Sequence, residues 1–401
     1  MGARLLAFLG VTGLLTVAVV TGQVERRPDD SNQTREPLRF KAPQTDYDFR
    51  DSSFVKSYSG GVYAWQEDVE LEADKAVYLG KTAEARFYGK ASFKDSLRQL
   101  RADTLVYYYT NREALAVGHV DVTEKNRLFR SGRVRYRKDF RLIEAFGGVY
   151  VRDDSVRSTI TGISAVFNDS TGNGVITGYP VLIREDKGGS FIRITCDDTL
   201  EVDRQNRVIR LWQNVVVTKD SLRVVANRAI YDDSLEVVSL YGKPVAQHVF
   251  FHRPEDAISE IKASSTVSGD SMWVYLKDRQ VSCVEVVGSA HATTVSTDST
   301  GGVYDESIID SASMRLSMAD DRISLITARG TAASYYHKAQ REDNQMFVNE
   351  AAGDTLYFFF SEGKISQLRI TGAGGSGARG KYYEFKPVTA STLKDSTGKS
   401  E

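Results

Sequence analysis

Few residues in this sequence are of a type and spacing that could support catalysis or metal binding. His248 and His252 stand four residues apart, a spacing that places two ligands on one face of a helix. Their segment, AQHVFFHRPED, lacks helical periodicity, so a solvated loop is favoured over a metal site. The remaining histidines are isolated, and the motifs of zinc proteases, serine hydrolases and phosphate-binding loops are absent from the sequence. We therefore expect no enzymatic activity, no metal and no cofactor.

Aspartates and aromatic residues recur in ways that allow a functional and a structural interpretation. A row of repeated aspartates could form the carboxylate pair that a polysaccharide-cleaving enzyme needs. The more economical interpretation is that they lie in turns or at strand starts and bind local backbone amides. They are Asp74, Asp103, Asp198, Asp270 and Asp354. The aromatic runs 107–109 and 358–360 could stack on sugars or bases, but core and rim positions of a sheet are favoured because no basic patch accompanies them.

The two cysteines, Cys196 and Cys283, could form one disulfide in an exported protein. They fall at different places in the repeat pattern described below, so two buried free thiols are the favoured interpretation. Neither has the neighbours of a metal site.

Composition limits the class of protein. The chain has 401 residues, with 52 Lys and Arg against 53 Asp and Glu, so no global field attracts nucleic acid. Hydrophobic residues make up 41% of the chain, which favours a folded protein over a disordered one. There are 7 prolines against 32 glycines, with 20 tyrosines and 18 phenylalanines, a balance typical of strands and turns.

The N-terminus has the pattern of a secretory signal peptide. Arg4 precedes an uncharged apolar stretch from Leu5 to Val20, and small residues follow near Gly22. We expect residues 1–22 to be a signal peptide and 23–46 a polar linker, with an uncleaved anchor as the alternative. The stretch is short for a bilayer-spanning helix. Export into the periplasm of a diderm bacterium is the predicted localisation, with membrane association through partners.

The central part of the chain is a repeat. Gly60, Gly89, Gly118 and Gly147 recur every 29 residues, and the ladder continues at longer steps to Gly372. Between the glycines lies a second motif line, as in RADTLVYY and GDTLYFF. A fixed period of this size indicates an array of one supersecondary unit. Each unit is predicted to hold two strands, and each glycine to sit where a strand bends or passes close to its neighbour.

Alternation within these strands defines one apolar side. Residues two and four positions after each Asp or Gly are apolar, and side chains two apart share one face of a strand. We predict that this face binds lipid. The candidate residues are Phe93, Leu105, Tyr107, Val120, Val122, Val134, Tyr136, Val149, Val151, Leu200, Val202, Val215, Val217, Tyr231, Met272, Val274, Leu356 and Phe358.

Turn residues separate the strands at short spacing, which favours hairpins and antiparallel neighbours. We expect an all-β protein of about nine two-stranded repeats over residues 47–372, divisible into two subdomains near 250–265. Residues 373–401 are expected to be a flexible tail with one short strand at Tyr382–Phe385.

The two alternating motif lines resemble the OstA/LptA-like family of lipopolysaccharide-transport proteins. The resemblance rests on Ala73-Asp74, Ala102-Asp103 and Gly353-Asp354 in one line and on Gly118 to Val122 in the other, and it covers about Ser59 to Gly372. It implies an elongated β-jellyroll, folded as an open V with an apolar interior that holds acyl chains. No room for the family's outer-membrane barrel follows Gly372, so we expect a long periplasmic variant.

The resemblance also implies partners. Strand edges at the ends of a jellyroll can pair with other jellyrolls of the transport machinery or, head to tail, with a second copy. The ligand would be lipopolysaccharide or a related glycolipid, bound by burial of its acyl chains. The alternative that the sequence leaves open is a structural or adhesive β-solenoid with a closed core and no lipid.

Overall fold

The computed structural model describes residues 36–50, 53–185, 189–252, 261–277, 280–297, 302–319, 322–340, 345–361, 364–372 and 379–385. In these ranges the chain is all-β, with 26 strands. None of the described residues forms a helix long and apolar enough to cross a membrane. The predicted signal peptide and most of the predicted linker lie outside the described residues.

The chain divides into two compact units. Among the described residues, those from 36 to 215, with 232–234, form the N-terminal unit, and 216–231 with those from 235 to 385 form the C-terminal unit. The division therefore falls at Val215 and not near 250–265 as the sequence predicted. Gly242 and its neighbours continue the same repeat on the far side of the boundary, so no change of pattern marks it.

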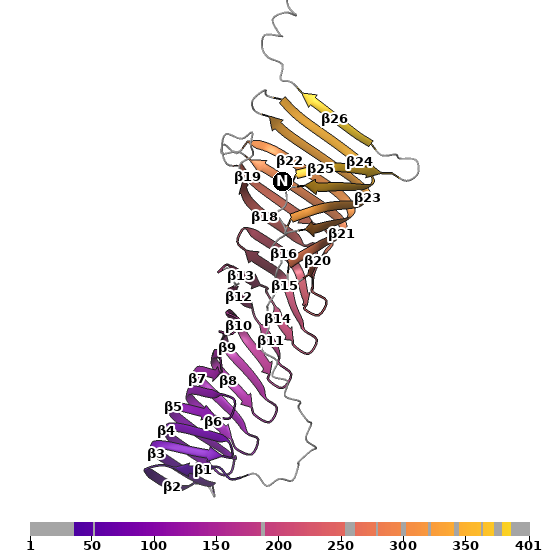
Figure 1. The fold of residues 1–401 in the computed structure, drawn as a ribbon. Helices are drawn as coiled ribbons and strands as arrows, with labels where there is room; N and C mark the ends of the chain where they lie inside the picture. The colour runs from indigo at the N-terminus through magenta and orange to yellow at the C-terminus, as the bar shows by residue number, and fades with distance from the viewer. Residues whose placement is uncertain are drawn as a thin grey trace, which may run out of the picture. The chain divides into compact units, whose positions relative to one another are not determined.

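The N-terminal unit is a meander in which β3 to β10 pair antiparallel in chain order (Figure 1). This confirms the predicted hairpin connections. Its strands are β1 (Arg39–Lys41), β2 (Gln44–Arg50), β3 (Ser53–Gln66), β4 (Val69–Leu79), β5 (Glu84–Lys94), β6 (Gln99–Tyr108), β7 (Glu113–Glu124), β8 (Arg127–Arg137), β9 (Leu142–Asp153), β10 (Ser158–Asn168), β11 (Asn173–Thr177), β12 (Val181–Glu185), β13 (Phe191–Thr195), β14 (Thr199–Asp203) and β15 (Val208–Lys219), the last of which runs past the boundary.

The C-terminal unit continues the antiparallel pattern with longer strands. Its strands are β16 (Leu222–Asp232), β17 (Val237–Tyr241), β18 (Val245–His252), β19 (Ile261–Ser268), β20 (Ser271–Lys277), β21 (Gln280–Thr297), β22 (Val303–Ala319), β23 (Arg322–Gln340), β24 (Gln345–Ser361), β25 (Lys364–Thr371) and β26 (Arg379–Phe385).

Each long strand is bent near its middle, and the two motif lines meet at the bend. On β7, Gly118 and His119 adopt positive φ angles of 79° and 42°. On β6, the register of pairing shifts between Arg101 and Thr104, which brackets Asp103. A Cβ atom at Gly118 would lie 2.3 Å from Oδ2 of Asp103. Glycine is therefore required both by its backbone angle and by the close approach of the aspartate, as the sequence predicted.

The bend corrects the predicted position of three of the five aspartates. Asp74, Asp103 and Asp354 lie within β4, β6 and β24, whereas Asp198 and Asp270 lie directly before β14 and β20, as the sequence predicted. A strand thus has two halves, which we call arms. The first arm ends at the β3–β4, β5–β6, β7–β8 and β9–β10 turns, and the second arm at the turns between them. The register between neighbouring strands changes by one residue across the aspartate, because one strand of the pair carries an extra residue at the bend.

The number of strands exceeds the expected eighteen because some bent strands are interrupted at the bend. β11 and β12 flank Gly178 to Pro180, and β17 and β18 flank Gly242 to Pro244. Proline has no N–H to donate to the ladder, so pairing breaks there.

Segments expected outside the repeat add further strands. β1 and the start of β2 lie in the predicted linker, and β26 in the predicted tail pairs with β24.

Candidate functional site: the apolar interior and its seam

The predicted apolar side is the inward side of both units. Sixteen of the eighteen candidate residues are buried, and Val151 and Val217 are half-buried. Residues after a glycine, such as Phe93 and Val120, line the first arm, and residues after an aspartate, such as Leu105, line the second. The structure therefore brings them together as one lining within each unit. Whether they contact lipid stays a prediction.

The interior has a second set of residues that the sequence analysis missed. Alternate residues before the Asp or Gly on the same strand are also buried, because the strand continues through the bend. Leu71, Phe87 and Leu100 are completely buried examples. The sequence does contain a sign of this second set. The apolar alternation of a strand skips one residue at the bend and then resumes, as in Leu100 and Ala102 followed by Leu105 and Tyr107.

The interior of the N-terminal unit is filled by its own side chains. The ring centroid of Phe93 lies 6.0 Å from that of Tyr107 and 5.7 Å from that of Tyr136. The Tyr107 hydroxyl donates to Oε1 of Gln66 at 2.7 Å, and the Tyr136 hydroxyl donates to Oδ2 of Asp95 at 3.0 Å. Burial raises the pKa of both tyrosines, so both hydroxyls remain protonated donors at neutral pH.

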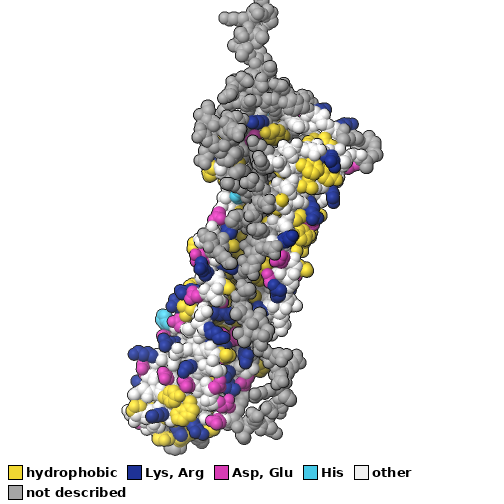
Figure 2. All heavy atoms as spheres, in the orientation of Figure 1, with side chains coloured by type: hydrophobic (Ala, Val, Ile, Leu, Met, Phe, Trp, Pro, Cys, Tyr) yellow, Lys and Arg dark blue, Asp and Glu magenta, His cyan; other side chains and the backbone are white. Residues whose placement is uncertain are grey.

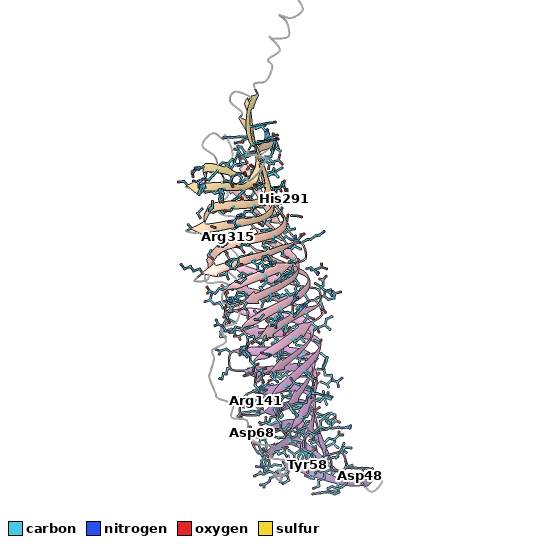
Figure 3. The ribbon with its side chains drawn as sticks, turned by 90° about the vertical axis from the view of Figure 1, so that its right-hand side faces the viewer. Asp48, Tyr58, Asp68, Arg141, His291 and Arg315 are labelled. Atoms are coloured by element: carbon cyan, nitrogen blue, oxygen red, sulfur yellow. The ribbon has the colours of Figure 1, made fainter. Side chains whose placement is uncertain are left out.

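Turns from the two arms meet along one side of the N-terminal unit, and we call this line of contacts the seam. Arg112, in the β6–β7 turn, binds Asp68 at 2.7 Å and Glu67 at 3.3 Å in the β3–β4 turn. Lys138, at the β8–β9 turn, also binds Asp68 and lies 3.5 Å from Asp95. Figure 3 shows Asp68 near Arg141, which belongs to the same turn as Lys138.

The seam continues around Arg98, whose side chain is only 1% exposed. Its guanidinium binds Asp169, in the β10–β11 turn, and lies over the ring of Tyr136 at 4.4 Å from the centroid. Asp95 caps the β5–β6 turn, to which Arg98 belongs, by accepting hydrogen bonds from the backbone N–H groups of Leu97 and Arg98 at 2.9 Å. Buried ion pairs of this kind are costly to break, because removal of one partner leaves a desolvated charge.

Electrostatics favour the ionised forms of Asp68, in the seam, and of Asp153. Burial alone would raise the pKa of Asp68, but the hydrogen bond and charge of Lys138 and the charge of Arg112 lower it overall. Asp153 behaves alike, because Ser155 and Arg127 outweigh its burial and lower its pKa. The seam therefore holds best when Asp68 is deprotonated.

The residues considered for catalysis or metal binding occupy structural positions. His248 lies in β18 and is buried, which corrects the predicted solvated loop. Asp103 binds Nδ1 of His119 at 2.8 Å on the exposed outer side of a bend, not a backbone amide. Cys196 and Cys283 are both buried free thiols, as the sequence predicted. Among the described residues, no three His, Cys, Asp or Glu side chains are grouped so as to hold a metal ion.

The outer surface mixes charges of both signs. Figure 2 shows Lys and Arg interspersed with Asp and Glu over the visible face, with small hydrophobic patches between them. Cross-strand ion pairs such as Lys94–Glu70 and Arg130–Asp121, at 3.1 and 2.9 Å, account for part of this pattern. The outer side is therefore that of a solvated sheet.

Comparison with known proteins does not assign the chain to a family. No protein-family model and no curated protein matches the chain. Solved structures that match include LptH, the LptA-homologous periplasmic component of the lipopolysaccharide transport device of Pseudomonas aeruginosa, with 8% identity and a TM-score of 0.13, covering 49% of this chain and 76% of that chain. Another is the WD40 domain of SCAP from fission yeast, with 8% identity and a TM-score of 0.14, covering 88% and 91%. TM-scores this low do not establish a shared fold.

Proposed function

We propose that this chain is an exported periplasmic protein that holds the acyl chains of lipopolysaccharide or a related glycolipid in its apolar interior. In this proposal it takes part in outer-membrane assembly as a binding scaffold, without enzymatic activity or a cofactor. Support comes from the apolar lining of both arms and from the resemblance of the two motif lines to the OstA/LptA-like family.

The observation that carries the proposal is the partly accessible inward face of the C-terminal unit. Inward residues beside the bend, such as Ala290 and Ala332, are fully buried. The next inward residues, Ala292 and its cross-strand neighbour Ile309, are apolar yet only half-buried. An acyl chain laid on such a face gains about 0.8 kcal/mol for each methylene that it buries. Burial alone can therefore hold a lipid with several chains.

Strand edges support the proposed partners. Among the described residues, β26 pairs with β24 alone, and β2 pairs with β3 alone. Each leaves one row of backbone N–H and C=O groups for another strand to pair with. Docking to other jellyroll proteins of lipopolysaccharide transport, or head-to-tail association of two copies, would use these edges.

A structural role without a ligand is the second candidate. It is favoured by the interior of the N-terminal unit, where Phe93 and Tyr107 are completely buried and the seam joins the two arms. In that case the repeat would serve as a closed scaffold.

Binding of dodecanoate to the purified mature protein, followed by calorimetry, tests the proposal. Saturable binding is expected. Ile309→Asn should weaken it at least tenfold, because Ile309 lies on the inward face. The matched control is Ile308→Asn, one residue away on the outward face and also half-buried, which should bind like the wild type. Absence of saturable binding to the wild type would favour the structural role.

A further inference from the structure

The first arm of the C-terminal unit changes in chemistry with distance from the bend. The residues that face the interior can be numbered along each strand, starting at the bend and moving towards the end of the arm. Strand register aligns residues of the same number across the sheet. The second inward position is mostly apolar, as at Val267, Ala292 and Ile309, which are consecutive cross-strand neighbours. The third position is polar on six successive strands, which gives the row His248, Ser265, Thr294, Ser307, Tyr336 and Asn349. We call this row the polar band.

The polar band runs from a buried end to an exposed end: His248 and Ser265 are buried, Thr294, Ser307 and Tyr336 are half-buried, and Asn349 is exposed. Ser265 is completely buried, and its hydroxyl lies 2.9 Å from that of Thr294 on the next strand. Ser296 and Asp305 extend the band one position further along their strands, and they are 0% and 3% exposed. The Ser296 hydroxyl has no hydrogen-bond partner among the described residues. A buried hydroxyl without a partner costs free energy that a bound polar ligand would recover.

In the N-terminal unit the same position has a different chemistry. There the third inward position of the first arm is charged from β5 to β9, and two of these residues, Asp95 and Arg98, form ion pairs across the seam with Lys138 and Asp169. In the C-terminal unit that position carries hydroxyl, imidazole and amide groups instead, and the strands extend beyond it. Such groups cannot close the arms by ion pairing, but they can donate and accept hydrogen bonds with a neutral, hydroxyl-rich molecule.

We propose that the polar band binds the sugar head group of a glycolipid whose acyl chains lie on the apolar positions nearer the bend. The inference rests on the proposed function, since it assigns the head group of the same ligand. Apolar groups near the bend and hydroxyl-binding groups farther out match the two ends of one amphiphile. The mostly uncharged band favours a neutral sugar over a phosphate, which would call for clustered Arg or Lys.

Two ligands with the same tail separate head-group binding from acyl-chain binding. We would titrate the full mature chain with dodecyl maltoside below its micellar concentration and with dodecanoate. Thr294→Val with Tyr336→Phe removes two hydroxyls from the band. The matched control is Thr293→Val with Tyr335→Phe, which removes the same groups from the outward face of the same strands. Ser307→Ala provides a milder inward variant if the double variant does not fold.

The inward double variant should bind dodecyl maltoside about tenfold more weakly or worse and dodecanoate unchanged, while the outward control matches the wild type for both. Unchanged maltoside binding, or an equal loss for both ligands, would overturn the head-group assignment and leave the proposed function standing. A wild type that binds neither ligand would overturn both.

Discussion

At the scale of single residues, the fold depends on an aspartate packed over a glycine at the bends. The same arrangement occurs at Gly89, Gly118 and Gly288, where an added Cβ would lie 2.5, 2.3 and 2.2 Å from Oδ2 of Asp74, Asp103 and Asp270 respectively. Each glycine has a positive φ angle. At these three bends the pairing gives the two motif lines one physical cause, whereas Gly242 faces Asn227 and Gly330 faces Ala312.

Substitution at two bend glycines should separate backbone strain from steric conflict. Gly148→Ala adds a methyl group where no atom lies within 4 Å, so only the φ angle of 86° is penalised, at about 1–2 kcal/mol. Gly118→Ala adds a conflict with Asp103 and should lose about 1–3 kcal/mol more. Urea unfolding of both variants measures the difference. Equal losses would contradict the role given to Asp103.

The two thiols should be unreactive in the folded protein. Burial raises the pKa of Cys196 to about 11 and also raises that of Cys283. Because the thiolate is the reactive form, a disulfide reagent at pH 8 should label the native protein slowly and the urea-unfolded protein at once. Cys196→Ser, which leaves Cys283 alone, should show the same protection. Fast labelling of the native wild type would show that the interior around Cys196 is open.

At the scale of elements, turns that are far apart in the sequence hold the two arms of the N-terminal unit together. Asp68 forms ion pairs with Arg112 and Lys138, which belong to two successive turns of the second arm. The pKa of Asp68 lies below its ordinary value, so the folded state favours its ionised form. Stability from such groups is complete above the unfolded pKa and is lost as the pH falls through the lower folded pKa.

The seam should therefore weaken in acid. Above pH 5, Asp68→Asn should be less stable than the wild type by up to about 1 kcal/mol, as is usual for partly exposed ion pairs. The difference should shrink as the pH falls below 3.8, the ordinary pKa of this carboxyl, because the wild-type side chain then becomes neutral too. Urea unfolding at pH 6, 4 and 3 measures it. A difference that stays constant across this range would show that the charge of Asp68 does not hold the seam.

At the scale of the whole molecule, the sequence predicted the β class, the hairpin order and the inward face, because a period of two is visible in any strand with one buried side. It did not predict the seam, since contacts such as Lys138 with Asp68 depend on how far the bends curve the sheet. It placed His248 in a loop because apolar residues on both faces of β18 obscure the alternation. It did not predict the polar band, because only the register between strands places serines and threonines from different repeats side by side.

Photo-crosslinking in a diderm cell that makes lipopolysaccharide tests the central claim most directly. A photoreactive amino acid would replace Ile309 on the inward face or, as the control, Ile308 on the outward face. Binding of acyl chains in the interior predicts lipopolysaccharide adducts at position 309 and none at position 308. Adducts at 308 alone, or no adduct at either position in a stably folded protein, would contradict it.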